Sequence, residues 1–238
     1  RGNDPIVYRE RKALGAALTP QIVDSLEDRF DKSAITYIPN TAETAYYGLL
    51  EGLRVYRRKR VHAQLLEALR NGTLDENMLD SAILKRWPRG EKIAHKDIKM
   101  RTFITQEKSR AQLVSHVYDL TYGAVGPEDV LVAIDDSIVR GTQLGETTEF
   151  LYHSGAKEVH IRPACPPILY GCKYLNFSRS TSEMELISRR VIEKLENGHV
   201  TDEILKEYAD PESARYEAMQ EEIRKQLNFT TLRFNRLD

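Results

Sequence analysis

The sequence predicts an α/β fold with a doubly wound, mainly parallel sheet. Short apolar segments alternate with segments of helical periodicity, which is the order expected of strand–helix–strand units. One of these segments, Val130 to Ile134, is apolar at every position. An uninterrupted apolar strand is typical of a parallel sheet covered by helices on both faces.

The amino-terminal part is predicted to form a helix, a strand and a second helix. Asp4-Pro5 is a typical helix start, and apolar residues at helical spacing continue to Pro20. A short apolar strand from Ala34 to Ile38 leads through a polar turn into a helix from Ala42 to Tyr56. We interpret the basic run Arg57 to Arg60 as the last turn of that helix, where cations suit the helix dipole.

The remaining pattern predicts a helical insertion, further strand–helix units and a helical carboxy-terminal extension. Residues 61–92 form the insertion, and residues 181–238 form the extension, which carries an apolar stripe made of Met184, Ile187, Val191, Ile192 and Leu195. The other expected elements are helices at 61–70, 75–87, 109–120, 143–154, 202–208 and 212–227, and strands at 101–105, 158–163 and 229–234.

Composition limits the possible functions. Lys and Arg number 35 against 36 for Asp and Glu, so the chain has no overall field for nucleic acid or an anionic membrane. No apolar run approaches the length of a membrane span, and no targeting segment precedes the first helix. We therefore expect a cytoplasmic protein that binds neither nucleic acid nor membranes, with Cys165 and Cys172 reduced.

The most informative motif follows the strand that begins at Val130. Two carboxylates, Asp135 and Asp136, end the strand, and a turn rich in hydroxyl groups then opens a helix. Backbone N–H groups from Ser137 to Thr142 and the start of the helix can cradle a phosphate, while the acids can meet sugar hydroxyls or a hydrated magnesium ion. The alternative is a solvated turn that only caps the next helix.

The same run, from Val130 to Thr142, resembles the phosphoribosyl pyrophosphate (PRPP) binding signature of type I phosphoribosyltransferases. Within that group, Asp135 to Thr142 resembles the amidophosphoribosyltransferase branch, the enzymes that begin purine synthesis. Further segments resemble this family in the expected order: Tyr8 to Gly15, Tyr37 to Thr41, Arg101 to Ile104, Ser154 to Val159, and Pro166 to Ile168.

This resemblance implies a type I phosphoribosyltransferase domain over residues 1–180 and a defined reaction. Family members transfer ammonia, made from glutamine in a separate domain, to carbon 1 of PRPP, releasing pyrophosphate and giving 5-phosphoribosylamine. Residue 1 is Arg where that glutaminase domain would begin with a cysteine, so we expect the domain to be missing from this chain. The chain would then work with ammonia at most, and it is expected to form a homo-oligomer.

The resemblance also assigns residues. It implies that Asp135, Asp136 and Arg101 are catalytic, that Thr41 joins the two acids as a Mg²⁺ contact, and that the backbone around Thr41 faces pyrophosphate. The PRPP-binding residues would be Asn40, Thr41, Ala42, Ser137, Ile138, Val139, Arg140, Gly141 and Thr142.

Some positions depart from the family pattern. His95-Lys96-Asp97-Ile98 stands where the family's mobile loop usually carries Lys-Asn-Arg-Tyr, and Asn40 replaces the usual acid. These departures keep open a second hypothesis, a PRPP-binding regulator or catalytically silent paralogue. A third hypothesis, a salvage transferase acting on a free base, is disfavoured because the loop carries Val139-Arg140-Gly141 and because no aromatic hood for a purine is evident.

Cys172 resembles a cysteine that binds a four-iron, four-sulfur cluster in one branch of the family. Two cysteines cannot supply the four ligands of such a cluster, so we expect one only in a longer protein. The alternative is a buried, inert thiol.

Overall fold

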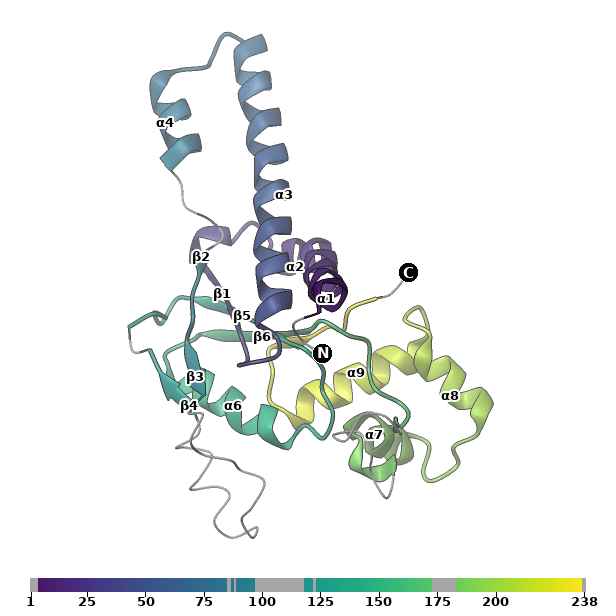
Figure 1. Ribbon diagram of the computed structural model, residues 1–238. Helices are drawn as coiled ribbons and strands as arrows, with labels where there is room; N and C mark the ends of the chain where they lie inside the picture. Colours follow the sequence, from purple (N-terminus) through teal and green to yellow (C-terminus); the bar gives the residue numbers. More distant parts are fainter. Residues whose placement is uncertain are drawn as a thin grey trace.

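The computed structural model describes residues 4–84, 87, 89–96, 118–121, 123–172 and 183–236. A five-stranded sheet in the order β2-β1-β5-β6-β7 runs through its centre, and every neighbouring pair of strands is parallel (Figure 1). The doubly wound α/β fold is therefore confirmed. The strands are β1 (Ser33–Tyr37), β2 (Arg89–Gly90), β5 (Val130–Asp135), β6 (Glu158–Pro163) and β7 (Thr231–Leu232).

Helices cover the sheet on both faces, and strand β5 is buried at all six positions. Its even-numbered side chains, such as Val132, pack in the core under α1 (Pro5–Ala17), α2 (Thr19–Leu26) and α3 (Glu43–Arg70). Its other side chains, such as Leu131, pack in the core with α6, α7 and α9. This two-sided burial explains why the strand is apolar throughout. The helices on this second face are α6 (Thr142–His153), α7 (Ile187–Leu195) and α9 (Ala214–Gln226).

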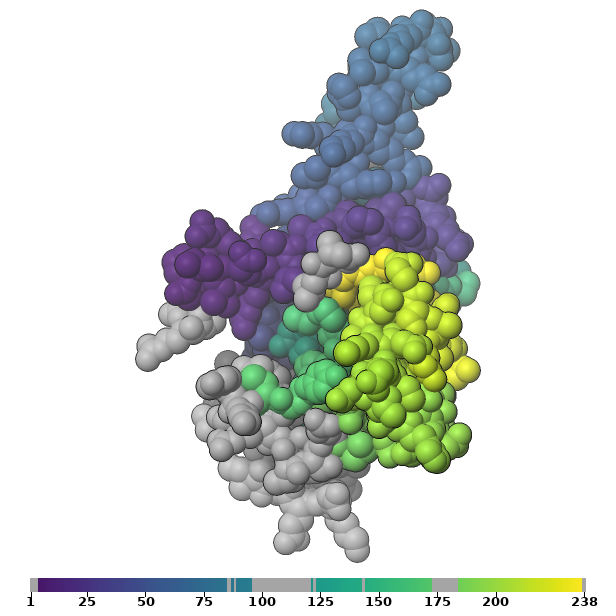
Figure 2. Space-filling view, turned by 90° about the vertical axis from the view of Figure 1, so that its right-hand side faces the viewer, coloured from purple at the N-terminus to yellow at the C-terminus, as the bar shows by residue number. Residues whose placement is uncertain are grey.

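Helix α3 is longer than the sequence pattern suggested. The helices expected at 42–56 and 61–70 are one helix of 28 residues, and Arg57 to Arg60 lie inside it rather than in its last turn. The reason is that the residues between Tyr56 and Val61 include no glycine or proline that would break a helix. Together with α4 (Glu76–Leu84), the outer half of α3 forms an arm that projects from the rest of the molecule (Figures 1 and 2).

A second, smaller sheet pairs β3 (Ala94–Lys96) with β4 (Tyr118–Leu120) in antiparallel order. The helix expected at 109–120 is therefore wrong at its end, because residues 118–120 form a strand. The rest of that helix and the strand expected at 101–105 lie outside the described residues.

The carboxy-terminal part contributes to the same core as the sheet. Ile187, Val191 and Ile192 are buried, as the apolar stripe predicted, whereas Met184 and Leu195 are 37% and 36% exposed. Helix α8 (Asp202–Ala209) precedes α9, and β7 then joins the edge of the sheet beside β6. No helix in the described ranges is long and apolar enough to cross a membrane.

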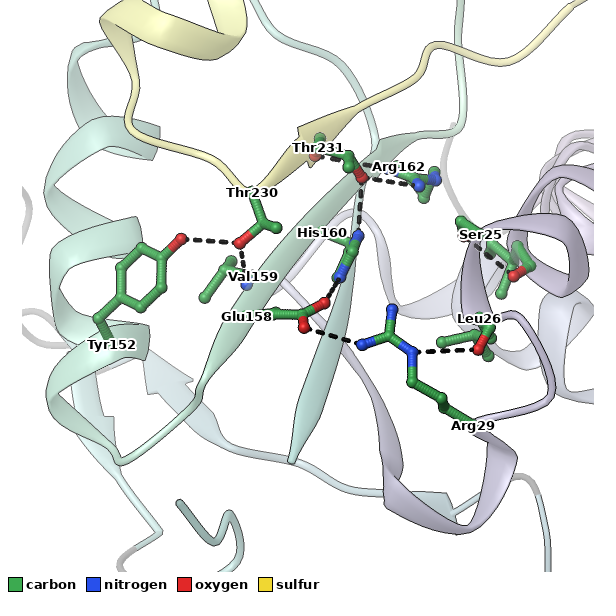
Figure 3. Close-up of polar contacts among 11 residues, drawn as sticks. Ser25, Leu26, Arg29, Tyr152, Glu158, Val159, His160, Arg162, Thr230 and Thr231 are labelled. Carbon is green, nitrogen blue, oxygen red and sulfur yellow. Dashed lines mark hydrogen bonds and ion pairs between the residues drawn. The ribbon is translucent and has the colours of Figure 1, made fainter. Parts of the chain in front are cut away.

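A polar network ties β7 to β6 and to the end of α2 (Figure 3). His160 contacts Thr231 Oγ1 through Nδ1 at 2.7 Å and Glu158 through Nε2 at 2.9 Å. Arg29 donates to Glu158 at 2.8 Å, and Arg162 donates to Thr231 Oγ1 at 2.9 Å. The edge of the sheet thus holds buried polar groups where an apolar core would be expected.

Candidate functional site

The parallel register brings three loops together at the carboxyl edge of the sheet. Tyr37 of β1 pairs with Ile134 of β5, and Asp135 pairs with Pro163 of β6. Just beyond the strands, the Ile38 N–H donates to the carbonyl of Ile134 at 2.8 Å, and the Ala164 N–H donates to the carbonyl of Asp135 at 2.8 Å. The loops that follow β1, β5 and β6 therefore leave the sheet side by side, which is where ligands bind in open α/β sheets.

The two acids at the end of β5 differ in burial. Asp135 is 9% exposed, and its Oδ1 accepts a hydrogen bond from the Asp136 N–H at 2.8 Å. Asp136 is half-buried. Burial, followed by the negative charge of Asp136, raises the pKa of Asp135 well above its ordinary value. The site therefore holds a carboxylate that a nearby cation would stabilise.

The loop from Ser137 to Thr142 turns sharply into α6. Gly141 has φ of +81°, a conformation that favours glycine, and a Cβ on it would lie 2.5 Å from Ile187 Cδ1, so a larger residue would also have to displace that side chain of α7. Ile138 anchors the loop in the core at 2% exposure. None of the N–H groups from Ser137 to Thr142 donates a hydrogen bond to another described residue. They remain available to an anion at the start of a helix.

Residues of the carboxy-terminal part bind the carbonyl groups of this loop. The Ile187 N–H donates to the carbonyl of Val139 at 2.8 Å, and Arg190 donates to the carbonyl of Arg140 at 2.8 Å. The side chain of Arg140 pairs with Glu185. Because the loop carbonyls are bound in this way, its N–H groups can face the other side. Sequence reasoning missed Arg190 and Glu185, since nothing in their order along the chain signals a contact with residue 140.

The loop after β1 presents the other predicted residues. Asn40 and Thr41 are exposed, and the peptide bond between Pro39 and Asn40 is cis. Ala42 is buried and precedes α3, and its carbonyl accepts the Tyr46 N–H at 3.0 Å. The structure thus brings residues 40–42 and 135–142 to one edge of the sheet.

A cysteine that the sequence did not mark out also lies there. Cys165 is the second residue after β6, and Asp136 is the first after β5. Burial, together with the charge of Asp136, raises the pKa of the Cys165 thiol. The position of a residue just after a parallel strand was the signal that could have identified it.

Arg101 lies outside the described residues, and Cys172 is half-buried and in no disulfide. The described residues contain no group of three or more His, Cys, Asp or Glu side chains that could hold a metal ion.

Comparison with known proteins gives this geometry a context. A stretch of 61 residues is 51% identical to the chloroplast amidophosphoribosyltransferase of Glycine max, and a stretch of 60 residues is 50% identical to the enzyme of Mus musculus. These stretches cover 26% and 25% of this chain and 10% and 11% of the two relatives. This segment is homologous to amidophosphoribosyltransferases.

Solved structures extend the likeness in fold to nearly the whole chain. An allosteric regulatory enzyme of purine biosynthesis matches 97% of this chain with a TM-score of 0.58 and 23% identity. The glutamine PRPP amidotransferase of B. subtilis, complexed with ADP and GMP, matches 97% with a TM-score of 0.57. The chain spans 35% and 36% of these two chains. No family model matches the chain. The two structural matches show that the chain has the fold of the phosphoribosyltransferase region of a PRPP amidotransferase.

Proposed function

We propose that this chain binds PRPP at the carboxyl edge of the sheet and transfers ammonia to carbon 1 of its ribose. The products are pyrophosphate and 5-phosphoribosylamine, and the reaction is the first step of IMP synthesis. In a full-length enzyme of this family, glutamine would supply the ammonia. The observation that carries the proposal is the β1–β5 register, which brings Asn40, Thr41 and the two acids together from distant parts of the chain.

The 5′-phosphate would bind to the loop before α6. Its N–H groups, from Ser137 to Thr142, have no partner among the described residues, and the positive end of the α6 dipole points to the same place. A glycine at 141 lets the backbone approach the phosphate closely. The hydroxyls of Ser137 and Thr142 can add two further donors.

The pyrophosphate would lie over the loop after β1, at Asn40 to Ala42. Mg²⁺ usually binds through one or two carboxylates together with substrate phosphates and water, and Asp135, Asp136 and the Thr41 hydroxyl fit that donor set. When bound, Mg²⁺ would neutralise charge on the leaving pyrophosphate. It would also offset the like-charge repulsion between Asp135 and Asp136.

The two acids would also act on the ribose. As pyrophosphate departs, positive charge develops on the sugar ring, as it does in glycoside cleavage, and a carboxylate held nearby stabilises that charge. Neutral ammonia can attack carbon 1 without a general base. Arg101 is our proposed cation for the leaving group.

Replacing both acids tests the assignment. We expect Asp135→Asn with Asp136→Asn to weaken Mg²⁺-dependent PRPP binding at least about tenfold, or about 1.4 kcal/mol. Isothermal titration calorimetry with PRPP and Mg²⁺ measures this directly. The double variant Asp24→Asn with Asp80→Asn is a matched control, because it removes the same charge from two exposed positions away from the site. Equal affinity in the acid variant and the control would refute the proposal.

A second measurement separates binding from catalysis. We expect this chain to release pyrophosphate from PRPP with ammonium salts and not with glutamine. PRPP binding without ammonium-dependent turnover would instead support a PRPP-binding regulator, as the altered residues at 95–98 suggested. Turnover with glutamine alone would contradict our account of the nitrogen source.

A further inference from the structure

The projecting arm carries a groove that the reaction proposed above does not use. The groove lies along the middle of α3 and has a volume of about 310 Å³. That is within the size range of small-molecule sites, about 300 to 1,000 Å³. It is lined by Arg54, Arg57, Arg58, Val61, His62, Leu65 and Trp87.

The charge of this groove is of one sign. Arg54, Arg58 and His62 are exposed, and none of them forms an ion pair with another described residue. No Asp or Glu is among the described residues that line the groove. The neighbouring cavity of about 520 Å³, between α3 and α4, differs because it includes Asp28, Asp31 and Glu67, and Arg60 there pairs with Asp28. An anion would therefore be attracted to the groove and not to the cavity beside it.

The groove and the cavity share one wall, which is formed by Arg57, Val61, Leu65 and Trp87. Trp87 stacks on Phe30 with ring centroids 4.3 Å apart, and the guanidinium of Arg57 lies 5.9 Å from the Trp87 ring. Arg57 donates one N–H to the carbonyl of Ala82 at 2.7 Å, whereas its buried Nε has no hydrogen-bond partner. Arg57 is thereby held beside the indole at the boundary of the groove.

We propose that the groove binds a small anion that also carries an aromatic group, such as an aryl phosphate ester. Guanidinium groups match the oxygens of a phosphate with paired N–H donors, and Arg54, Arg57 and Arg58 provide three of them within two helical turns. Val61, Leu65 and the indole of Trp87 provide the apolar surface for the ring. A ligand that carries both a phosphate and a ring would contact both the arginines and the apolar surface.

This site is separate from the PRPP site. Both lie along α3, but Arg57 is fifteen residues beyond Ala42, which corresponds to about 22 Å at 1.5 Å per residue. Failure of one assignment therefore leaves the other intact, since PRPP binding and groove binding are measured with different ligands and different variants.

The single tryptophan of the chain makes the site directly measurable. We expect 1-naphthyl phosphate to change the fluorescence of Trp87 and to bind in calorimetry, and 1-naphthol and inorganic phosphate to bind at least about tenfold more weakly. Arg54→Ala with Arg58→Ala should weaken 1-naphthyl phosphate at least about tenfold, about 1.4 kcal/mol. Arg70→Ala is the matched control, because Arg70 is an exposed cation of the same helix outside the groove.

The outcomes are distinct. Loss of binding in the double variant but not in Arg70→Ala, with unchanged thermal unfolding and PRPP affinity, supports the site. Equal binding of inorganic phosphate would show a simple anion site, and equal binding of 1-naphthol would show an apolar surface suited to a protein partner; either would overturn the proposal. Binding of 1-naphthyl phosphate that is unaffected by Arg54→Ala with Arg58→Ala would also overturn it.

Discussion

Two regions of the same sheet bury charge in opposite ways. At the end of β5, Asp135 is 9% exposed and stands beside a second carboxylate, and burial raises its pKa. In the β6–β7 network, His160 and Arg162 are 3% and 0% exposed, but both hydrogen-bond to Thr231. Burial lowers the pKa of Arg162 to about 9 and also lowers that of His160. Arg162 is hydrogen-bonded to carbonyl and hydroxyl oxygens inside the fold, which serves stability, whereas Asp135 stands beside a like charge at an open loop, which indicates a ligand.

The largest expected effect is in the β6–β7 network. Thr231 Oγ1 contacts both His160 and Arg162, so Thr231→Val would leave two buried groups without this partner. At about 1 to 3 kcal/mol for each, we expect the free energy of unfolding to fall by about 2 to 6 kcal/mol. Chemical denaturation measures the change.

The control for this variant is Thr231→Ser, which keeps the hydroxyl and should retain most of the stability. PRPP affinity should stay within about twofold in both variants, an effect below 0.5 kcal/mol or so. Equal stability of Thr231→Val and Thr231→Ser would show that the network does not stabilise the sheet edge.

The opposite result is expected at the end of β5. Asp135→Asn removes a buried charge and its repulsion from Asp136, while the amide oxygen can still accept the Asp136 N–H. We therefore expect the ligand-free, Mg²⁺-free protein to gain stability, on the order of 1 kcal/mol, and to bind PRPP more weakly. Thermal unfolding and calorimetry on the same sample test both halves. A loss of stability would show instead that the Asp135 carboxylate stabilises the fold, as the polar groups of β6 and β7 do.

The sequence could predict the strand and loop at the carboxyl edge of the sheet because their signals are local. A fully apolar strand, two acids and a glycine-containing turn occupy consecutive positions, and the structure has β5, the loop and the start of α6 at Val130–Asp135 and Thr142. The spacing of Ala34 to Ile38 likewise predicted β1 to within one residue.

What was missed depends on contacts between distant residues. The alternation Glu158, His160, Arg162 along β6 looks like a polar face, and only β7, some seventy residues later, makes it a buried one. The hydrogen bond from Arg190 to the carbonyl of Arg140 also joins residues that are remote in sequence. The continuity of α3 was missed because a basic run was given a capping role that the helix did not need.

The smallest expected effect is a pH dependence of stability. Burial lowers the pKa of His160 below its ordinary value of 6.5, so the folded protein binds this proton less readily than the unfolded chain. Stability is then lost as the pH falls through 6.5, by at most about 1.4 kcal/mol per pH unit. We expect a loss of about 0.5 to 1 kcal/mol between about pH 7 and pH 5.5 that is absent in His160→Gln.

Asp135 acts in the opposite direction, because a raised acid pKa favours the folded state as the pH falls. This contribution is the same in both proteins and cancels in their difference. Urea denaturation of the two proteins at each pH measures that difference. Identical slopes would mean that the pKa of His160 is the same in the folded and the unfolded chain, so that burial in the network does not disfavour its protonation.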